Sequence, residues 1–178
     1  MMRSRLTPLL VVAPLLAAGL AFLEAAPATG EDTGVCTLLT RQEAGELLGA
    51  KVVKTSTKTS KANGAEECTY KTRKAQKRFK KSGVKMQLEV TVEPLTDELQ
   101  AKLQRIPSED GERVEGLGDE AYASKFDDVT AIAGNVAVGA KLQNYADSPT
   151  KFRSVSQGAL RIALPRLDTL EVSPPAST

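Results

Sequence analysis

The stretch Gly34-Val-Cys-Thr-Leu-Leu-Thr-Arg-Gln-Glu-Ala-Gly-Glu-Leu-Leu-Gly49 organises the chain because it holds both a start and a stop signal for a helix. Thr40 and Glu43 have the spacing of a capping box, in which hydroxyl and carboxylate each accept a hydrogen bond from an unpaired backbone N–H. Gly49 stands where a residue of left-handed conformation ends a helix. The stretch therefore predicts a short helix between Thr40 and Gly49.

The chain has two cysteines, Cys36 in this stretch and Cys68 in the motif Cys68-Thr-Tyr70. Two cysteines in an oxidising compartment predict a disulfide, which would join the first helix to the strand that carries Tyr70. On the chain-entropy model, closing a loop of this length stabilises the fold by about 3 to 4 kcal/mol. A reactive thiol or a metal-binding pair is the alternative, although the chain has no histidine and zinc would lack its usual ligands.

Residues 1–28 have the features of a secretory signal peptide. Arg3 and Arg5 precede the apolar run Leu6 to Leu23, and Ala26-Pro27-Ala28 offers a small-residue cleavage site. We therefore predict an extracytoplasmic protein of the cell envelope or one released from the cell. The competing interpretation is a retained membrane anchor, because the apolar run approaches the ~20 residues that span a bilayer.

The remaining chain is nearly neutral and has the length of one domain. Without Arg3, Arg5 and Glu24, the 24 basic and 22 acidic residues become 22 and 21. We expect a polar lead over 29–34, a single domain over 35–168 and a disordered Ser- and Pro-rich tail over 169–178.

Periodicity predicts the elements of this domain. Met86, Leu88, Val90 and Val92 alternate with polar residues, as in a strand with one buried face. Gly134-Asn135 separates two further alternating runs and predicts a hairpin. The other predicted elements are strands over 51–58 and 65–72 and through Tyr122, and helices beginning at Thr96 and at Asp147 or Ser148. The pattern predicts an α+β fold: an antiparallel sheet of about six strands with about three helices packed on one side.

Three motifs in this order resemble a family of small secreted or lipid-anchored envelope domains of actinobacterial-type bacteria, a domain of unknown function. They are Cys36-Thr-Leu-Leu-Thr-x-x-Glu-Ala-x-x-Leu-Leu-Gly49, Cys68-Thr-Tyr70, and Gly116-Leu-Gly-Asp-Glu-Ala-Tyr122 followed by the Gly134-Asn135 hairpin. The resemblance implies a compact α+β fold, a disulfide between the two motif cysteines and residence outside the cytoplasmic membrane. It supplies no catalytic residues, and this chain lacks the lipidation cysteine that many relatives carry after the leader.

Catalytic chemistry has little support in the sequence. Without histidine there is no Ser-His-Asp triad, and bridged cysteines cannot act as nucleophiles. Adjacent carboxylates occur at Glu66-Glu67, Asp119-Glu120 and Asp127-Asp128, but a glycosidase also needs aromatic walls, and the chain has no tryptophan. Asp119-Glu120 could face a ligand or cation, although a turn shaped by the flanking glycines explains it more simply. We predict no enzyme activity, no cofactor and no metal site.

Residues 71–85 form a basic run with no acidic residue. Its cations are Lys71, Arg73, Lys74, Lys77, Arg78, Lys80, Lys81 and Lys85, and Lys51, Lys54, Lys58 and Lys61 on the preceding hairpin could lie near them. This density of charge predicts a binding module for an anionic envelope polymer or lipid headgroups. Nucleic acid is disfavoured because Tyr70 and Phe79 alone interleave, and a solvated loop is the simpler explanation. The alternative function is a small-ligand or lipid carrier or sensor with an apolar pocket between helices and sheet.

Overall fold

A computed structural model describes residues 34–73, 86–143 and 149–170, with the side chains of 149–151 left out. All of these residues belong to one compact unit, Glu31–Thr178. The predicted signal peptide, nearly all of the polar lead, most of the basic run and the end of the tail lie outside the described residues.

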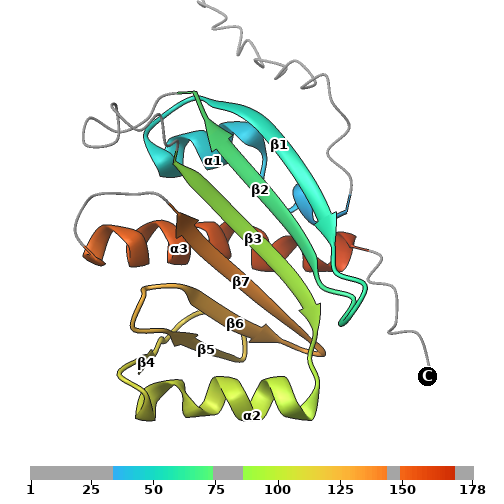
Figure 1. Cartoon of the computed structure of the whole chain (residues 1–178), viewed down its shortest axis with the longest axis vertical. Helices are drawn as coiled ribbons and strands as arrows, with labels where there is room; N and C mark the ends of the chain where they lie inside the picture. Colours follow the sequence, from blue (N-terminus) through green and yellow to red (C-terminus); the bar gives the residue numbers. More distant parts are fainter. Residues whose placement is uncertain (1–33, 74–85, 144–148, 171–178) are drawn as a thin grey trace, which may run out of the picture. The chain divides into compact units, whose positions relative to one another are not determined.

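Seven strands form one antiparallel sheet in the order β1-β2-β3-β7-β6-β5-β4 (Figure 1). The strands are β1 Val52–Thr59, β2 Glu66–Thr72, β3 Gln87–Pro94, β4 Glu112–Arg113, β5 Glu120–Ala123, β6 Val129–Ala133 and β7 Val136–Gln143. The α-helices are α1 Arg41–Leu48, α2 Asp97–Arg105 and α3 Pro149–Ala163, and the 3₁₀ helices are η1 Gly34–Thr37, η3 Ile106–Ser108 and η4 Leu164–Thr169. The predicted α+β fold is confirmed. The extra strand is β4, whose two residues are too few to show a period of two in the sequence.

Helix α1 begins and ends as the sequence predicts. The Thr40 hydroxyl accepts a hydrogen bond from the Glu43 N–H at 3.2 Å, and the Glu43 carboxylate accepts one from the Thr40 N–H at 2.8 Å. Gly49 follows the last turn with φ of 61°, a conformation that glycine adopts without steric cost. Both ends of the helix are therefore set by local residues.

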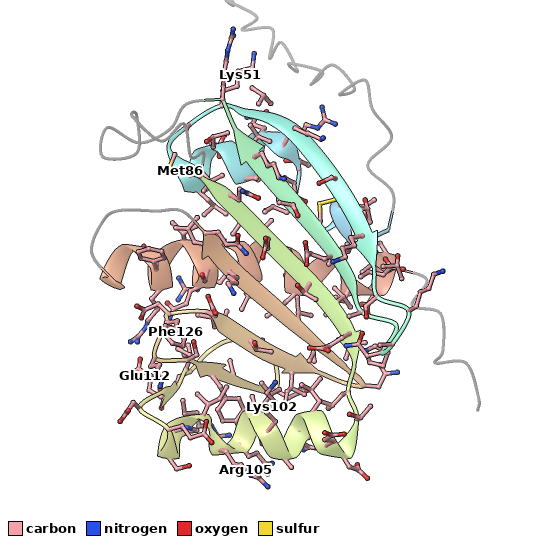
Figure 2. The ribbon with its side chains drawn as sticks, in the orientation of Figure 1. Lys51, Met86, Lys102, Arg105, Glu112 and Phe126 are labelled. Carbon is pink, nitrogen blue, oxygen red and sulfur yellow. A yellow bond between two sulfur atoms is a disulfide. The ribbon has the colours of Figure 1, made fainter. Side chains whose placement is uncertain are left out.

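A disulfide joins η1 to β2. Cys36 and Cys68 are bonded, with their Cα atoms 5.1 Å apart. The bond between two sulfur atoms is drawn in yellow in Figure 2. The fully buried Tyr70, two residues after Cys68, donates its hydroxyl proton toward the backbone carbonyls of Leu39 and Cys36. The predicted disulfide is confirmed, and a buried hydroxyl supports the same junction.

The helices cover both faces of the sheet, so the prediction that they share one side is wrong. Ala137 packs with Leu103 of α2, whereas its neighbour Val138 belongs to the core that includes Val155 of α3. Successive strand residues point to opposite faces, so α2 and α3 lie on opposite sides. The cause is that Tyr122 of β5, Ile132 of β6 and Ala137 of β7 form a second apolar patch on the face opposite the main core, and this patch must also be buried.

The end of the described chain returns to the first helix. Arg166 in η4 binds Glu43 through two nitrogen–oxygen contacts of 2.6 and 2.8 Å, and it also donates to the Leu38 carbonyl at 3.1 Å. The hydrogen bonds from Arg166 hold the pKa of Glu43 at about 2, below its ordinary 4.5. The carboxylate therefore stabilises the fold fully above pH 4.5, and this contribution is lost as the pH falls toward 2.

Replacing Cys36 and Cys68 together with alanine should lower the free energy of unfolding by about 3 to 4 kcal/mol, because the unfolded chain regains the freedom of a closed loop. Urea unfolding of the oxidised protein and the double variant measures the difference. Reductant should destabilise the wild type and leave the variant unchanged. A wild type indifferent to reductant would contradict the cross-link.

Arg166→Ala should lower the free energy of unfolding at pH 7 by about 1 to 2 kcal/mol, a value reduced for the partial exposure of both partners. The difference between variant and wild type should shrink between pH 4.5 and pH 2, where Glu43 takes up its proton. Urea unfolding at pH 7 and pH 2.5 measures it. Arg161→Ala, an exposed arginine on α3, is the matched control and should behave as wild type at both pH values. A pH-independent loss would contradict the assigned role of the ion pair.

Candidate functional site

Two of the eight predicted anion-binding residues lie in the described part of the chain. Lys71 is in β2 and Arg73 follows that strand directly, whereas Lys74, Lys77, Arg78, Lys80, Lys81 and Lys85 lie outside the described residues. Lys71 stands directly opposite Lys54 of β1, and the Arg73 N–H donates to the Lys51 carbonyl at 3.3 Å. Four cations therefore meet at one end of the β1–β2 pair. We call Lys51, Lys54, Lys71 and Arg73 the basic end.

The basic end concentrates positive charge. Within the described residues, none of the ion pairs involves any of these four side chains. Like charges directly opposite on neighbouring strands destabilise a sheet, and Lys54 with Lys71 is such a pair. Lysines 58 and 61 do not join them, because Lys58 stands opposite Glu67 and Lys61 lies in the turn at the far end of β1. Of the four lysines on the hairpin, the structure therefore places only Lys51 and Lys54 beside Lys71 and Arg73.

A polar surface continues from the basic end across β2, β3 and β7, on the side of the sheet that faces away from α1 and α3. On this side, residues of β2, β3 and β7 stand in rows across the strands. One row is Lys71, Gln87 and Gln143, and the next is Thr69, Glu89 and Lys141. The Gln143 amide donates to Glu89 at 2.7 Å. This surface, which we call the polar face, is held by hydrogen bonds between neighbouring strands.

On the polar face, the ionised form of the Glu89 carboxylate is disfavoured. Burial raises the pKa of Glu89, and the negative charge of Glu67 raises it further, while Lys141 and the Gln143 hydrogen bond oppose the shift. Burial likewise raises the pKa of Asp128, which lies 3.8 Å from the Lys141 ammonium group. Both groups bind their protons more tightly in the folded chain than in the unfolded one. Their ionisation therefore works against folding at neutral pH.

Glu89→Gln should raise the melting temperature at pH 7 by about 1 to 3 °C, because the amide can occupy the same site without a buried charge. A carboxyl group whose pKa is raised by folding stabilises most at low pH, and its contribution falls as the pH rises through the folded-state pKa. The gain should therefore disappear below about pH 4, where wild-type Glu89 is protonated. Calorimetry at both pH values measures it, with the exposed Glu115→Gln as the control. A lower melting temperature at pH 7 would contradict the assignment.

Asp119, a candidate ligand in the sequence, shapes a turn. Its carboxylate accepts a hydrogen bond from the Gly134 N–H at 2.8 Å, and its own N–H donates to the Ile132 carbonyl at 2.7 Å. Gly116 and Gly118 before it have positive φ angles of 73° and 56°. The simpler explanation, a turn shaped by two glycines, describes what is observed.

The other acidic residues also make contacts within the fold, and the two members of a pair bind different partners. Glu120 accepts a hydrogen bond from the Tyr122 hydroxyl and lies 3.7 Å from Arg113. Glu67 accepts from the Thr69 hydroxyl at 3.0 Å, whereas Glu66 is on the opposite face, toward η1. Adjacent strand carboxylates thus point apart and do not enclose a common cleft.

The loop between β5 and β6 is held by an arginine of α3. Arg153 binds Asp127 at 2.9 Å and also contacts Glu112. Asp127 has a φ of 62°, and this tight turn leaves the neighbouring Phe126 side chain 71% exposed. Figure 2 places Phe126 and Glu112 close together, far from Lys51. These ion pairs could not be predicted from the sequence, because the partners are distant along the chain.

A shallow hollow of about 710 Å³ runs beside α1 and the start of β1. Its lining residues are Arg41, Gln42, Gly45, Glu46, Gly49, Ala50, Lys51 and Val52. It therefore borders the basic end at Lys51. It does not correspond to the predicted pocket between helices and sheet, where the described side chains form the buried core.

The described residues show neither a metal-binding cluster nor a helix that could span a membrane. They contain no group of three or more histidine, cysteine, aspartate or glutamate residues that could hold a metal ion. Over the same part of the chain, no helix is both long and apolar enough to cross a bilayer.

Comparison of the chain with protein-family models, with curated proteins and with solved structures finds no significant match. The resemblance to a family of envelope domains therefore stays a prediction.

Proposed function

We propose that the chain is an extracytoplasmic binding module that engages an anionic partner through its basic end. The observation that supports this most is the direct opposition of Lys54 and Lys71, beside Lys51 and Arg73, with no acidic partner among the described residues. A cross-strand pair of cations costs stability, and a bound anion relieves that cost.

The sequence extends the basic end. Residues 74–85 connect β2 to β3 and carry six more lysines and arginines without an acidic residue. An envelope polymer or a layer of lipid headgroups presents repeated negative charges, which suits several cations at one end of a domain. Affinity for such a partner depends on released counterions and falls as salt rises.

The proposed compartment has two supports. The Cys36–Cys68 disulfide is typical of proteins that fold in an oxidising environment. The apolar run Leu6 to Leu23 behind Arg3 and Arg5 is typical of a secretory leader. A soluble domain released from that leader would meet anionic polymers at the cell surface.

A non-enzymatic role agrees with the contacts of the acidic residues. Asp119, Glu120 and Asp127 are each engaged in a turn or an ion pair. The alternative of a carrier with a pocket between helices and sheet has less support, because the described side chains there are packed core. The hollow beside Lys51 is the place where a small anionic ligand would instead be sought.

Neutralising the basic end with Lys54→Gln, Lys71→Gln and Arg73→Gln together should weaken binding to anionic envelope fractions and to inorganic polyphosphate at least tenfold at low salt. The slope of log affinity against log salt should fall by about one for each charge removed that contacts the polyanion. Sedimentation with the fractions and titration with polyphosphate measure the two effects.

The matched control removes three exposed cations elsewhere, Lys102, Arg105 and Lys125. Figure 2 places Lys102 and Arg105 on α2, at the opposite end of the domain from Lys51. This control should bind as wild type does. Equal losses in the two triple variants would mean that net charge alone matters, and unchanged binding in the first would contradict the proposal.

A further inference from the structure

Strand β1 is an edge of the sheet that the rest of the described chain leaves unpaired. Among the described strands it pairs with β2 alone, over the eight residues from Val52 to Thr59. Figure 1 shows β1 as the outermost strand, at the other edge from β4. An edge of this length presents a row of backbone donors and acceptors to which an extended segment can be added.

The hydrogen-bond pattern identifies which groups face outward. The Ser60 N–H donates to the Ala65 carbonyl at 2.7 Å, and pairing alternates along an antiparallel ladder. Lys58, Ser56 and Lys54 therefore bond to β2, in agreement with the Thr72 N–H, which bonds instead to Met86 near β3. The remaining residues, Thr55, Thr57 and Thr59, direct their N–H and C=O groups to the free edge.

Charge selects the kind of strand that fits. Lys54 and Lys58 project from β1 onto the polar face, and lysines on an edge strand oppose pairing with neutral or basic strands. A second copy of β1, centred on Ser56, would set Lys54 opposite Lys58 twice, which is unfavourable. A strand with carboxylates at alternate positions would instead place them opposite these lysines and near Lys71.

The start of β1 offers an additional contact. A bulge between Val52 and Lys54 leaves the Val53 side chain 44% exposed, one of two large hydrophobic side chains so exposed among the described residues. Val52 also lines the hollow beside α1. An added strand would therefore meet exposed methyl groups at this end, besides the backbone and the lysines.

From these contacts we infer that the anionic partner is an acidic, extended polypeptide segment of another protein, which adds to the β1 edge as an antiparallel eighth strand. This inference depends on the proposed function and names a polypeptide, in place of an envelope polymer or lipid headgroups, as the anionic partner of the basic end. The main-chain groups of Thr55, Thr57 and Thr59 supply the hydrogen bonds, and Lys54 and Lys71 supply the charge selection, whereas Lys58 already stands opposite Glu67.

The test uses the oxidised protein and the synthetic peptide (Thr-Glu)₄, whose carboxylates all lie on one face of a strand. Titration should show binding, and amide hydrogen exchange should slow at Thr55, Thr57 and Thr59. The control peptide (Thr-Lys)₄ should not bind. In an antiparallel strand the threonine amides of the peptide face β1, so N-methylation of those amides should weaken binding more than tenfold, whereas N-methylation of the glutamate amides should not.

A protein variant gives a second readout. Thr57→Pro removes an outward N–H without removing a bond of the β1–β2 ladder, and proline is tolerated on edge strands. Thr57→Pro should bind (Thr-Glu)₄ at least fivefold more weakly than wild type. Thr57→Val, which keeps the N–H, should bind the peptide as wild type does. If Thr57→Pro does not fold, the N-methylated peptides still decide the question, because they leave the protein unchanged.

Polyphosphate separates the two proposals. Binding of polyphosphate together with strand-specific binding of (Thr-Glu)₄ supports both. Binding of polyphosphate with no peptide binding, or with equal loss from both N-methylated peptides, overturns the eighth strand and leaves the anion-binding module standing. Binding of neither probe overturns both.

Discussion

The antiparallel pairing of β3 with β7 is the interaction on which the rest of the structure depends. The two strands run side by side over eight residue pairs, from Gln87 opposite Gln143 to Pro94 opposite Val136. They join a hairpin and strand from the first half of the chain to a meander from the second half. Because the pairing lies at the centre of the sheet, it brings the two halves into one core.

The two halves of the sheet differ in how much of each face is buried by helices. Strands β5 to β7 carry the main core on the face toward α3, and a smaller apolar patch of Tyr122, Ile132 and Ala137 on the other face is covered by α2. Strands β1 to β3 are apolar on one face and polar on the other, as Val90 and Glu89 illustrate. The polar face and the basic end therefore occur where only one layer of helix is required. Polar and charged side chains can remain exposed there because the fold does not need to bury that face.

Two contacts hold the N-terminal elements against this framework. The disulfide and the Tyr70 hydroxyl bind η1 to β2, and the Arg166 guanidinium binds the first turn of α1 through Glu43. They hold η1 and α1 against β1 on the core side of the sheet. The outer edge of β1 has no strand partner among the described residues. The same junction that stabilises the domain leaves its proposed interaction surface exposed.

The sequence by itself determined the local features: the capping box of Thr40 with Glu43, the left-handed Gly49, the hairpin at Gly134-Asn135 and the alternation that defines β3. Each depends on residues a few positions apart, whose preferences act before any tertiary contact forms. The disulfide was also accessible, because two cysteines leave one intramolecular pairing. The α+β class followed from the order of these elements.

Only the tertiary structure decided which elements meet. The pairing of β3 with β7, the position of α2 on the opposite face, the contact of Arg166 with Glu43 and the opposition of Lys54 to Lys71 join residues whose partners no local rule specifies. The charge of the basic run was visible in the sequence, but the position of Lys71 opposite Lys54 follows only from the pairing of β2 with β1. Packing of the core fixes that register, since a shift of β2 by one residue would turn Cys68, Tyr70 and Thr72 away from the core.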